Sequence, residues 1–323
     1  MVFDRKVLTV ILKGIATYLP GITRFIQKKS GATVGTSSAR YCYSVWLRHL
    51  VIAYKNGFIE YPKVVAELGP GDSLGIGLAA LISGADKYYG LDVIEFANKE
   101  SNMEIFDDLV ELFLNRSSIP DDNEFPRLKP LLDSYEFPSY MFSDNYFETI
   151  LSKDRLDKIR ALIVPVSNDV SDYISIKYIV PWDKDKVILR NSVDMIISQA
   201  VLEHVNDLDG SYIAMHKWLK PGGFMSHEID FKCHRISANW DYHWTCSDFI
   251  WKLIVGKRKY FLNRHPYSVH INSLKNSGFK IICDIKNNTE SSIKRKNLAK
   301  RFIEMSDDDL ITSEVFILAV HQN

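Results

Sequence analysis

The stretch SHEIDFKCHRISANWDYHW gathers four side chains that can exchange protons or bind ligands. The four are His227, Asp230, His234 and His243. A carboxylate that polarises an imidazole can help to remove the proton of a hydroxyl group, and nearby tryptophans can offer an apolar surface to a sugar ring. Any one of these residues, His227 on its strand above all, fits the core equally well. A metal site is an alternative, but the spacing matches no fixed metal-binding motif, and we predict none.

A glycine-rich loop in AELGPGDSLGIGLAAL is the second candidate site. Gly69 and Gly71 allow a ligand to approach the backbone closely, while the acid Glu67 precedes them and Asp92 ends the next predicted strand. Leu74 stands where a dinucleotide-binding motif needs its third glycine, and the loop has no lysine of the kind that a phosphate-binding loop requires. Asp92 can accept hydrogen bonds from both hydroxyls of a ribose. The loop therefore favours a nucleoside-like ligand that needs no pyrophosphate.

Short apolar strands, separated mostly by helical patterns, must position these residues. The predicted strands are, in order, KVVAELG, KYYGLDV, YISIKYIVPW, SVDMIISQ, GFMSHEIDF, FKIICDI and EVFILAVH. This alternation predicts an α/β fold, with a Rossmann-like, doubly wound and mostly parallel sheet of seven strands. Chemistry in such sheets lies beyond the carboxyl ends of the strands, which is where both candidate sites fall.

Two further segments depart from the regular alternation. Residues 1–62 are predicted to form an N-terminal helical cap, and residues 63–323 the main domain. Over residues 117–173 prolines interrupt aromatic and acidic stretches, so we predict a helical insertion that is either a lid or merely structural. Lys13 and Gly14 interrupt the apolar N-terminal stretch, so an amphipathic helix packed on the domain is favoured over a membrane-surface helix.

The composition excludes several classes of protein. Forty Lys and Arg balance forty Asp and Glu in 323 residues, so no overall electric field favours nucleic acid or an anionic membrane. No apolar run is long enough for a transmembrane segment. The four cysteines contain no CxxC pair, which indicates reduced thiols and a cytoplasmic location.

Three segments together carry a family resemblance. VVAELGPG, YYGLDV and SVDMIISQAVLEHVNDLDGSYIAMHKWLKPGGFM resemble the nucleotide-binding core of class I S-adenosylmethionine-dependent methyltransferases, and the last segment is similar to their small-molecule, type 11 branch. The resemblance spans about residues 64–96 and 178–230. It implies S-adenosyl-L-methionine as the cofactor and an antiparallel final strand. The wider arrangement also resembles bacterial methyltransferases associated with surface-polysaccharide biosynthesis.

The resemblance also implies which residues contact the cofactor. They are Glu67, Gly69, Gly71, Asp92, Ser198 and Gln199. Asp92 would hold the ribose, and Ser198 and Gln199 would lie beside the methionine moiety. Trp182 is a candidate for the adenine contact, because the acid that often follows the third strand is absent.

Outside these segments, Arg40 in the predicted cap can meet the cofactor's carboxylate or an anionic substrate. The adjacent Glu203 and His204 invite an acid–base or metal interpretation. We expect them mainly to shape the floor of the cofactor site, since neighbouring helical side chains point in different directions.

We therefore expect an enzyme that transfers a methyl group from S-adenosylmethionine to a small molecule by in-line displacement. The expected acceptor is a hydroxyl of a sugar or nucleotide-linked sugar, with a His/Asp general base. Transfer to a nitrogen or carbon of another metabolite is one alternative, and a non-catalytic S-adenosylmethionine-binding module is another. No nucleic-acid partner is expected, and a homodimer is left open.

Overall fold

The computed structural model describes residues 5–19, 35–163, 173–182, 187–234 and 236–322. The α-helices are α1 (Arg5–Ala16), α3 (Ala39–Lys55), α4 (Gly75–Ile82), α5 (Lys99–Leu114), α6 (Asp144–Ile150), α7 (Lys153–Ile163), α8 (Leu208–Trp218), α9 (Asp248–Val255), α10 (Tyr267–Asn276) and α11 (Asp307–Ile311). The strands are β1 (Val64–Leu68), β2 (Lys87–Leu91), β3 (Ser175–Ile179), β4 (Val193–Gln199), β5 (Leu219–Asp230), β6 (Phe279–Asn288) and β7 (Thr312–His321). Short 3₁₀ turns are η1 (Leu202–His204), η2 (Tyr242–Thr245), η3 (Arg295–Asn297) and η4 (Lys300–Phe302).

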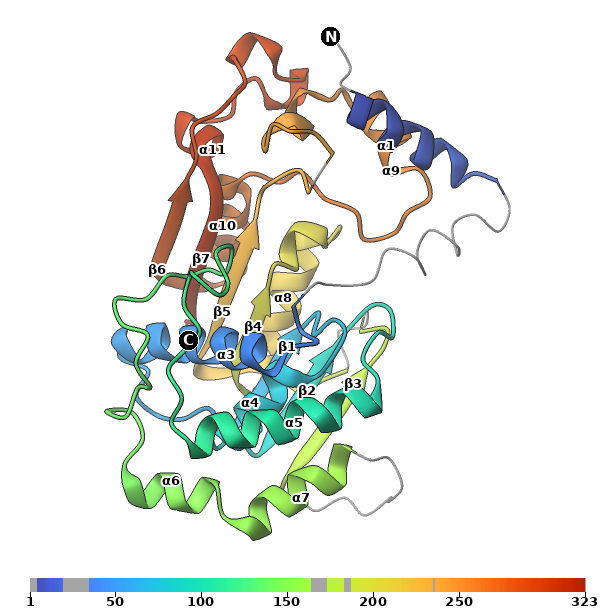
Figure 1. The fold of residues 1–323 in the computed structure, drawn as a ribbon. Helices are drawn as coiled ribbons and strands as arrows, with labels where there is room; N and C mark the ends of the chain where they lie inside the picture. The colour runs from blue at the N-terminus through green and yellow to red at the C-terminus, as the bar shows by residue number, and fades with distance from the viewer. Residues whose placement is uncertain (1–4, 20–34, 164–172, 183–186, 235, 323) are drawn as a thin grey trace.

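The strands form one sheet of seven, in the order β3-β2-β1-β4-β5-β7-β6 (Figure 1). The first five strands pair in parallel, and β7 runs antiparallel to both β5 and β6. The predicted fold class and the antiparallel final strand are therefore confirmed. The order reverses between β1 and β4, which is the point where open α/β sheets bind their ligands.

Both faces of the sheet are covered, which is why its central strands are mostly apolar. On β1, Val65 packs into a core shared with α3, α4 and α5, whereas Ala66 and Leu68 pack into a second core shared with α8 and α10. Ser38 caps α3 by accepting a hydrogen bond from the backbone of Tyr41. Successive strand residues thus reach opposite layers of helices, and the pleat decides which layer each side chain meets.

Arg48 of α3 anchors the segment that follows α5. Its side chain is fully buried, and its guanidinium donates hydrogen bonds to the carbonyl oxygens of Pro120 (3.0 Å), Leu128 (3.1 Å) and Pro130 (2.7 Å). The described part of the predicted 117–173 insertion contains the helices α6 and α7. The insertion therefore begins as a loop tied to α3 before it turns helical.

The N-terminal helix α1 lies beside α9, at one end of the molecule in Figure 1. It buries Val7 and Ile11 in a small third core and leaves Leu8 and Leu12 exposed on its other side. Within the described ranges, no helix combines the length and the apolar character needed to cross a membrane. All four cysteines are free thiols, as the sequence predicted.

Candidate functional site

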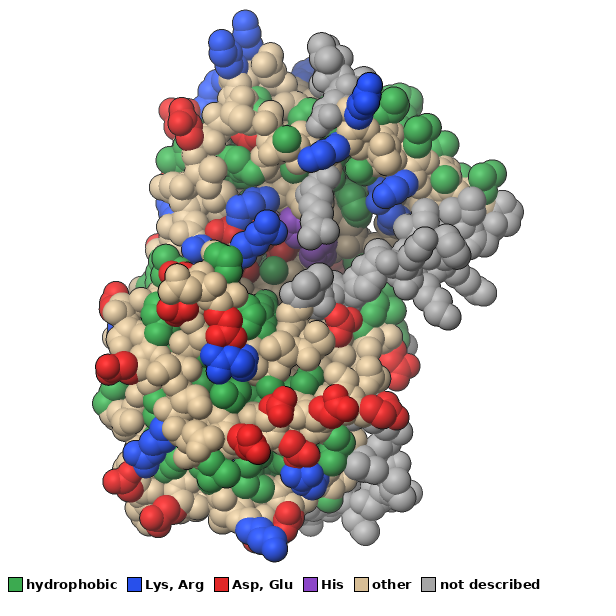
Figure 2. Space-filling model, viewed as in Figure 1, with side chains coloured by type: hydrophobic (Ala, Val, Ile, Leu, Met, Phe, Trp, Pro, Cys, Tyr) green, Lys and Arg blue, Asp and Glu red, His purple; other side chains and the backbone are tan. Residues whose placement is uncertain are grey.

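Two cavities lie beyond the carboxyl ends of the parallel strands. The glycine-loop cavity has a volume of about 710 Å³ and is lined by Gly69, Asp92, Trp182 and the first turns of α8. The β5 cavity has a volume of about 830 Å³ and is lined by residues of the β5 end and by residues 124–128 of the insertion. Figure 2 shows histidine side chains within a hollow on this face, with acidic and basic side chains around them.

The chain segment after β4 borders both cavities. Gln199 and Ala200 line the β5 cavity, whereas Val201 and His204 line the glycine-loop cavity. We call residues 199–204 the border segment. Because the segment is so short, a ligand in one cavity lies next to a ligand in the other.

The glycine loop has the backbone that its residues predicted. Gly69 and Gly71 have φ angles of +63° and +77°, in the left-handed region that favours glycine. The N–H of Gly69 donates to the carbonyl oxygen of Leu91 at 2.8 Å, which joins the loop to the end of β2. A Cβ atom at Gly69 would lie 2.7 Å from Cγ2 of Val201. The loop thus packs directly on the border segment, and Gly69 lines the cavity between them.

The two acids near this loop have different surroundings. Asp92 lines the glycine-loop cavity, and its Oδ1 accepts hydrogen bonds from the N–H groups of Val93 (2.7 Å) and Ile94 (3.4 Å). Burial raises the pKa of Asp92. Glu67 is instead buried against Tyr88, whose hydroxyl donates to Oε2 at 2.6 Å, and burial raises the pKa of Glu67 to about 8. Glu67 lines neither cavity, so Asp92 is the acid that can contact a ligand directly.

Ser198 and Gln199 are neighbours in the chain, but only Gln199 lines a cavity. Ser198 is buried, and its hydroxyl is hydrogen-bonded to Nδ1 of His227 at 2.8 Å. The side chain of Gln199 bridges two elements, since Oε1 lies 3.0 Å from Nε2 of His49 on α3 and Nε2 donates to Glu228 at 3.2 Å. Gln199 therefore lines the β5 cavity with its side chain held from both sides. The sequence did not indicate that His49 would hold Gln199 in place.

Trp182 lines the glycine-loop cavity and makes an edge-to-face contact with Trp218, with ring centroids 6.1 Å apart. Trp182 therefore lines the same cavity as Asp92, and its contact with adenine stays a prediction. Arg40 instead forms a bidentate ion pair with Glu124, with N–O distances of 2.7 and 2.6 Å. Glu124 lines the β5 cavity, but Arg40 itself lines neither of the two cavities.

His227 and His243 are both buried, and neither lines one of the two cavities. His227 packs among Ser198, Met225 and the core on the α8 side, because the pleat of β5 turns it away from Glu228 and Asp230. His243 is 2 % exposed and stacks near Trp244. Burial lowers the pKa of each to about 3, so both are neutral imidazoles at ordinary pH.

Asp230 and His234 come together in the β5 cavity. Nε2 of His234 lies 3.4 Å from Oδ2 of Asp230, and the loop between them turns back with a φ of +44° at His234. Lys232 contributes a cation, 3.5 Å from Asp230, and also pairs with Glu314. Burial alone would raise the pKa of Asp230, but the hydrogen bond to His234 and the charge of Lys232 lower it below its ordinary value. Asp230 is thus an ionised carboxylate that orients an accessible imidazole.

Glu203 in η1 has surroundings that sequence reasoning missed. Its side chain is 3 % exposed, and neither carboxylate oxygen forms a hydrogen bond with the described residues. Burial, with Glu228 and Asp230 nearby, raises the pKa of Glu203 well above its ordinary value. The only signal for it in the sequence is the LEH triplet directly after the fourth predicted strand.

The sequence also matches a family model described as a methyltransferase domain, over residues 179–226. The match runs from the end of β3 into β5 and includes the whole border segment. This part of the chain carries a methyltransferase domain. The match and the sheet topology confirm the expected class of enzyme and its S-adenosylmethionine cofactor.

Several solved structures resemble the methyltransferase at low identity. One is an S-adenosylmethionine-dependent methyltransferase from Mesorhizobium loti, at 15 % identity and a TM-score of 0.38, covering 83 % of this chain and 96 % of that one. Another is phosphoethanolamine N-methyltransferase 2 from Haemonchus contortus in complex with S-adenosyl-L-methionine, at 14 % identity and a TM-score of 0.41, covering 86 % and 53 %. Likenesses of this size say nothing about the acceptor. A search of curated proteins finds no match.

Proposed function

We propose that this methyltransferase transfers the methyl group of S-adenosylmethionine to a hydroxyl of a sugar or nucleotide-linked sugar bound in the β5 cavity. The pairing of Asp230 with His234 on the wall of that cavity carries the proposal. The pair lies close to the border segment, beyond which the glycine-loop cavity begins. An acceptor at the pair can therefore face a methyl donor across the border segment.

The cofactor is assigned to the glycine-loop cavity. Asp92 accepts hydrogen bonds from the ribose hydroxyls, the open backbone at Gly69 admits the amino-acid end, and Trp182 contacts the adenine. Glu67 supports the loop from the core instead of contacting the cofactor. We do not assign Arg40 to the cofactor, because its guanidinium already binds Glu124.

The reaction is an in-line displacement at the methyl carbon. The acceptor oxygen forms a bond to that carbon while the bond from carbon to the sulfonium sulfur breaks, and S-adenosylhomocysteine is released. The hydroxyl proton passes to the Asp230–His234 pair, in which the carboxylate stabilises the imidazolium. His227 and His243 take no part, because their buried rings reach neither cavity.

The lining of the β5 cavity suits a sugar. Glu124 and Glu314 are carboxylates that can accept hydrogen bonds from sugar hydroxyls. Trp240 also lines the cavity, with its ring held by a hydrogen bond from Nε1 to the carbonyl oxygen of Glu290 at 3.1 Å. A fixed indole offers a platform for a sugar ring. Arg127 and Lys232 can bind the phosphate of a nucleotide-linked sugar.

An amine acceptor is the second candidate, and the charges of the cavity favour it. The lining carboxylates are those of Glu124, Asp230 and Glu314, against the cations of Arg127 and Lys232, while burial raises the pKa of Glu228 well above its ordinary value. An excess of carboxylates attracts a cationic amine, and an amine that binds in its neutral form needs no general base to be methylated. The methylated atom of the product distinguishes the two candidates.

The test is methyl transfer to a panel of nucleotide sugars and amines, with identification of the methylated atom. We expect Asp230→Asn and His234→Ala to keep the thermal stabilisation by S-adenosylhomocysteine and to lose turnover. His265→Gln is the matched control, since His265 lines neither cavity. Normal turnover in both cavity variants would refute the role of the pair, and methylation of nitrogen alone would replace the hydroxyl with the amine.

We also propose where in the cell the reaction takes place and which kind of metabolism it serves. We place it in the cytoplasm, among the reactions that supply sugars for surface polysaccharides, as the family resemblance and the reduced cysteines suggest. A homodimer is compatible with this proposal, and mass measurement in solution would test it.

A further inference from the structure

The buried carboxylate of Glu203 has no partner that explains its position. It lies in η1, directly after β4, with a side chain that is 3 % exposed and two oxygens that form no hydrogen bonds within the described part of the chain. A buried carboxylate without hydrogen bonds is costly to fold around. A ligand that supplies positive charge would remove that cost.

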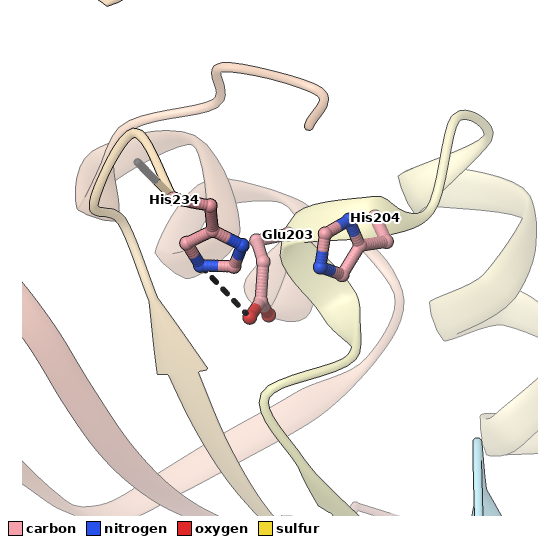
Figure 3. A group of neighbouring side chains, drawn as sticks. All are labelled: Glu203, His204 and His234. Carbon is pink, nitrogen blue, oxygen red and sulfur yellow. Dashed lines mark ion pairs between the residues drawn. The ribbon is translucent and has the colours of Figure 1, made fainter. Parts of the chain in front are cut away.

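Two imidazoles face the Glu203 carboxylate from either side (Figure 3). His204 lies next to it in η1, and its buried Nδ1 has no hydrogen-bond partner among the described residues. His234 reaches it from the loop after β5, with Nε2 at 4.0 Å from Oε1 of Glu203. One ligand atom from each of the three residues lies within 4.8 Å of the other two.

We propose that Glu203, His204 and His234 bind one divalent transition-metal ion. Two imidazoles and a carboxylate form a donor set that suits zinc, iron or cobalt better than magnesium or calcium, which prefer oxygen ligands throughout. A tetrahedral ion with bonds of about 2.1 Å holds its ligand atoms roughly 3.4 Å apart, so the three side chains need to close by about 1 Å. His234 is on a surface loop and is 32 % exposed, which leaves it room to move.

Asp230 completes the surroundings of the ion. Its Oδ2 lies 3.4 Å from the same Nε2 of His234 that faces Glu203. Because it faces the nitrogen of His234 that would bind the ion, Asp230 lies within reach of an acceptor bound at the open side of the ion. The site therefore has three ligands, one neighbouring carboxylate and an open side toward the β5 cavity, which Asp230 and His234 line.

The position of the ion gives it a role that rests on the proposed function. His204 lines the glycine-loop cavity and His234 lines the β5 cavity, so the ion would adjoin both cavities and lie beside the acceptor. An ion with an open position can bind the acceptor oxygen and polarise its O–H bond. In the metal-bound enzyme His234 is a ligand, and Asp230 alone of the pair is left to take the proton.

Cobalt provides a direct test that does not depend on turnover. Purified full-length protein, freed of metal with a chelator, is titrated with Co²⁺ and followed by visible absorption. We expect one equivalent to bind with the absorption of a nitrogen-coordinated ion. His234→Gln and Glu203→Gln should each weaken binding by at least about tenfold. His234→Gln keeps the test decisive if the buried Glu203→Gln variant does not fold.

Two control variants separate this site from other histidines. His265→Gln should bind Co²⁺ like the wild type. His216 and His321 form a second close pair, with ring centroids 3.9 Å apart, so loss of binding in His216→Gln alone would locate the ion there and overturn the proposal. Absence of binding to the wild type, or equal binding by His234→Gln, would also overturn it. Binding of S-adenosylhomocysteine is measured separately. Its loss in the wild type would show that the cofactor assignment is wrong, independently of the result with Co²⁺.

Discussion

Replacing Gly69 with alanine tests how the glycine loop and the border segment fit together. The added Cβ atom would lie 2.7 Å from Cγ2 of Val201, well inside an ordinary carbon–carbon contact, and the φ of +63° is unfavourable for any residue with a Cβ. The backbone strain costs about 1–2 kcal/mol, and moving Val201 costs about 1 kcal/mol more. We therefore expect Gly69→Ala to destabilise the protein by about 2–3 kcal/mol.

Gly57→Ala is the matched control for this prediction. Gly57 has a φ of +94° but no atom within 4 Å of its added Cβ, so the control carries the backbone strain without the clash. Thermal unfolding should rank the wild type above Gly57→Ala and Gly57→Ala above Gly69→Ala. The double variant Gly69→Ala/Val201→Ala should recover the part of the loss that comes from the clash.

Cofactor affinity provides the second readout. Val201 and Gly69 both line the glycine-loop cavity, so relief of the clash pushes the valine side chain toward the bound ligand. If about 1.4 kcal/mol of the strain is carried into binding, S-adenosylhomocysteine binds tenfold more weakly. Equal destabilisation by Gly57→Ala and Gly69→Ala, with unchanged S-adenosylhomocysteine affinity, would refute the reasoning.

Three further predictions address separate parts of the molecule. Asp92→Ala should abolish most of the thermal stabilisation by S-adenosylhomocysteine, and an undiminished shift in calorimetry would remove the acid from the cofactor site. The pKa of Glu67 is raised to about 8 from an ordinary 4.5, so folding favours its neutral form. Its contribution to stability is therefore present at low pH and declines as the pH rises from about 4.5 to about 8. Glu67→Gln should flatten the fall in melting temperature over that pH window. Arg48→Met leaves carbonyl oxygens unpaired, so it should lower the free energy of unfolding in denaturant by about 3 kcal/mol and raise the KM for the acceptor. The control Lys55→Met, which removes an exposed ion pair, should change the free energy of unfolding by less than about 1 kcal/mol.

The sequence predicted best what depends on local chain geometry. Gly69 and Asp92 were identified because a tight turn and a strand end leave direct marks in the residue pattern, and both line one cavity. The alternation of strands and helices likewise predicted the mostly parallel sheet of seven strands. Here the local pattern and the tertiary arrangement agree.

The catalytic cluster could not be resolved in the same way. His227, Asp230 and His234 are close in the chain, but the pleat of β5 turns His227 into the core, and a left-handed residue at His234 folds the loop back toward Asp230. Glu203 lies in a single 3₁₀ turn instead of the expected helix, and His234 approaches its carboxylate from the loop after β5. Both outcomes depend on backbone conformations that residue types alone do not specify.

The anchoring of the insertion by Arg48 has an evolutionary consequence. Residues 124–128, which form one wall of the β5 cavity, belong to the anchored loop, whereas no residue of that loop lines the glycine-loop cavity. Arg48 binds backbone carbonyl oxygens, which any residue at those positions would supply. Side chains in the loop can therefore diverge to accept a new substrate while the anchor and the cofactor site stay intact, so related enzymes can share a methyl donor and differ in what they methylate.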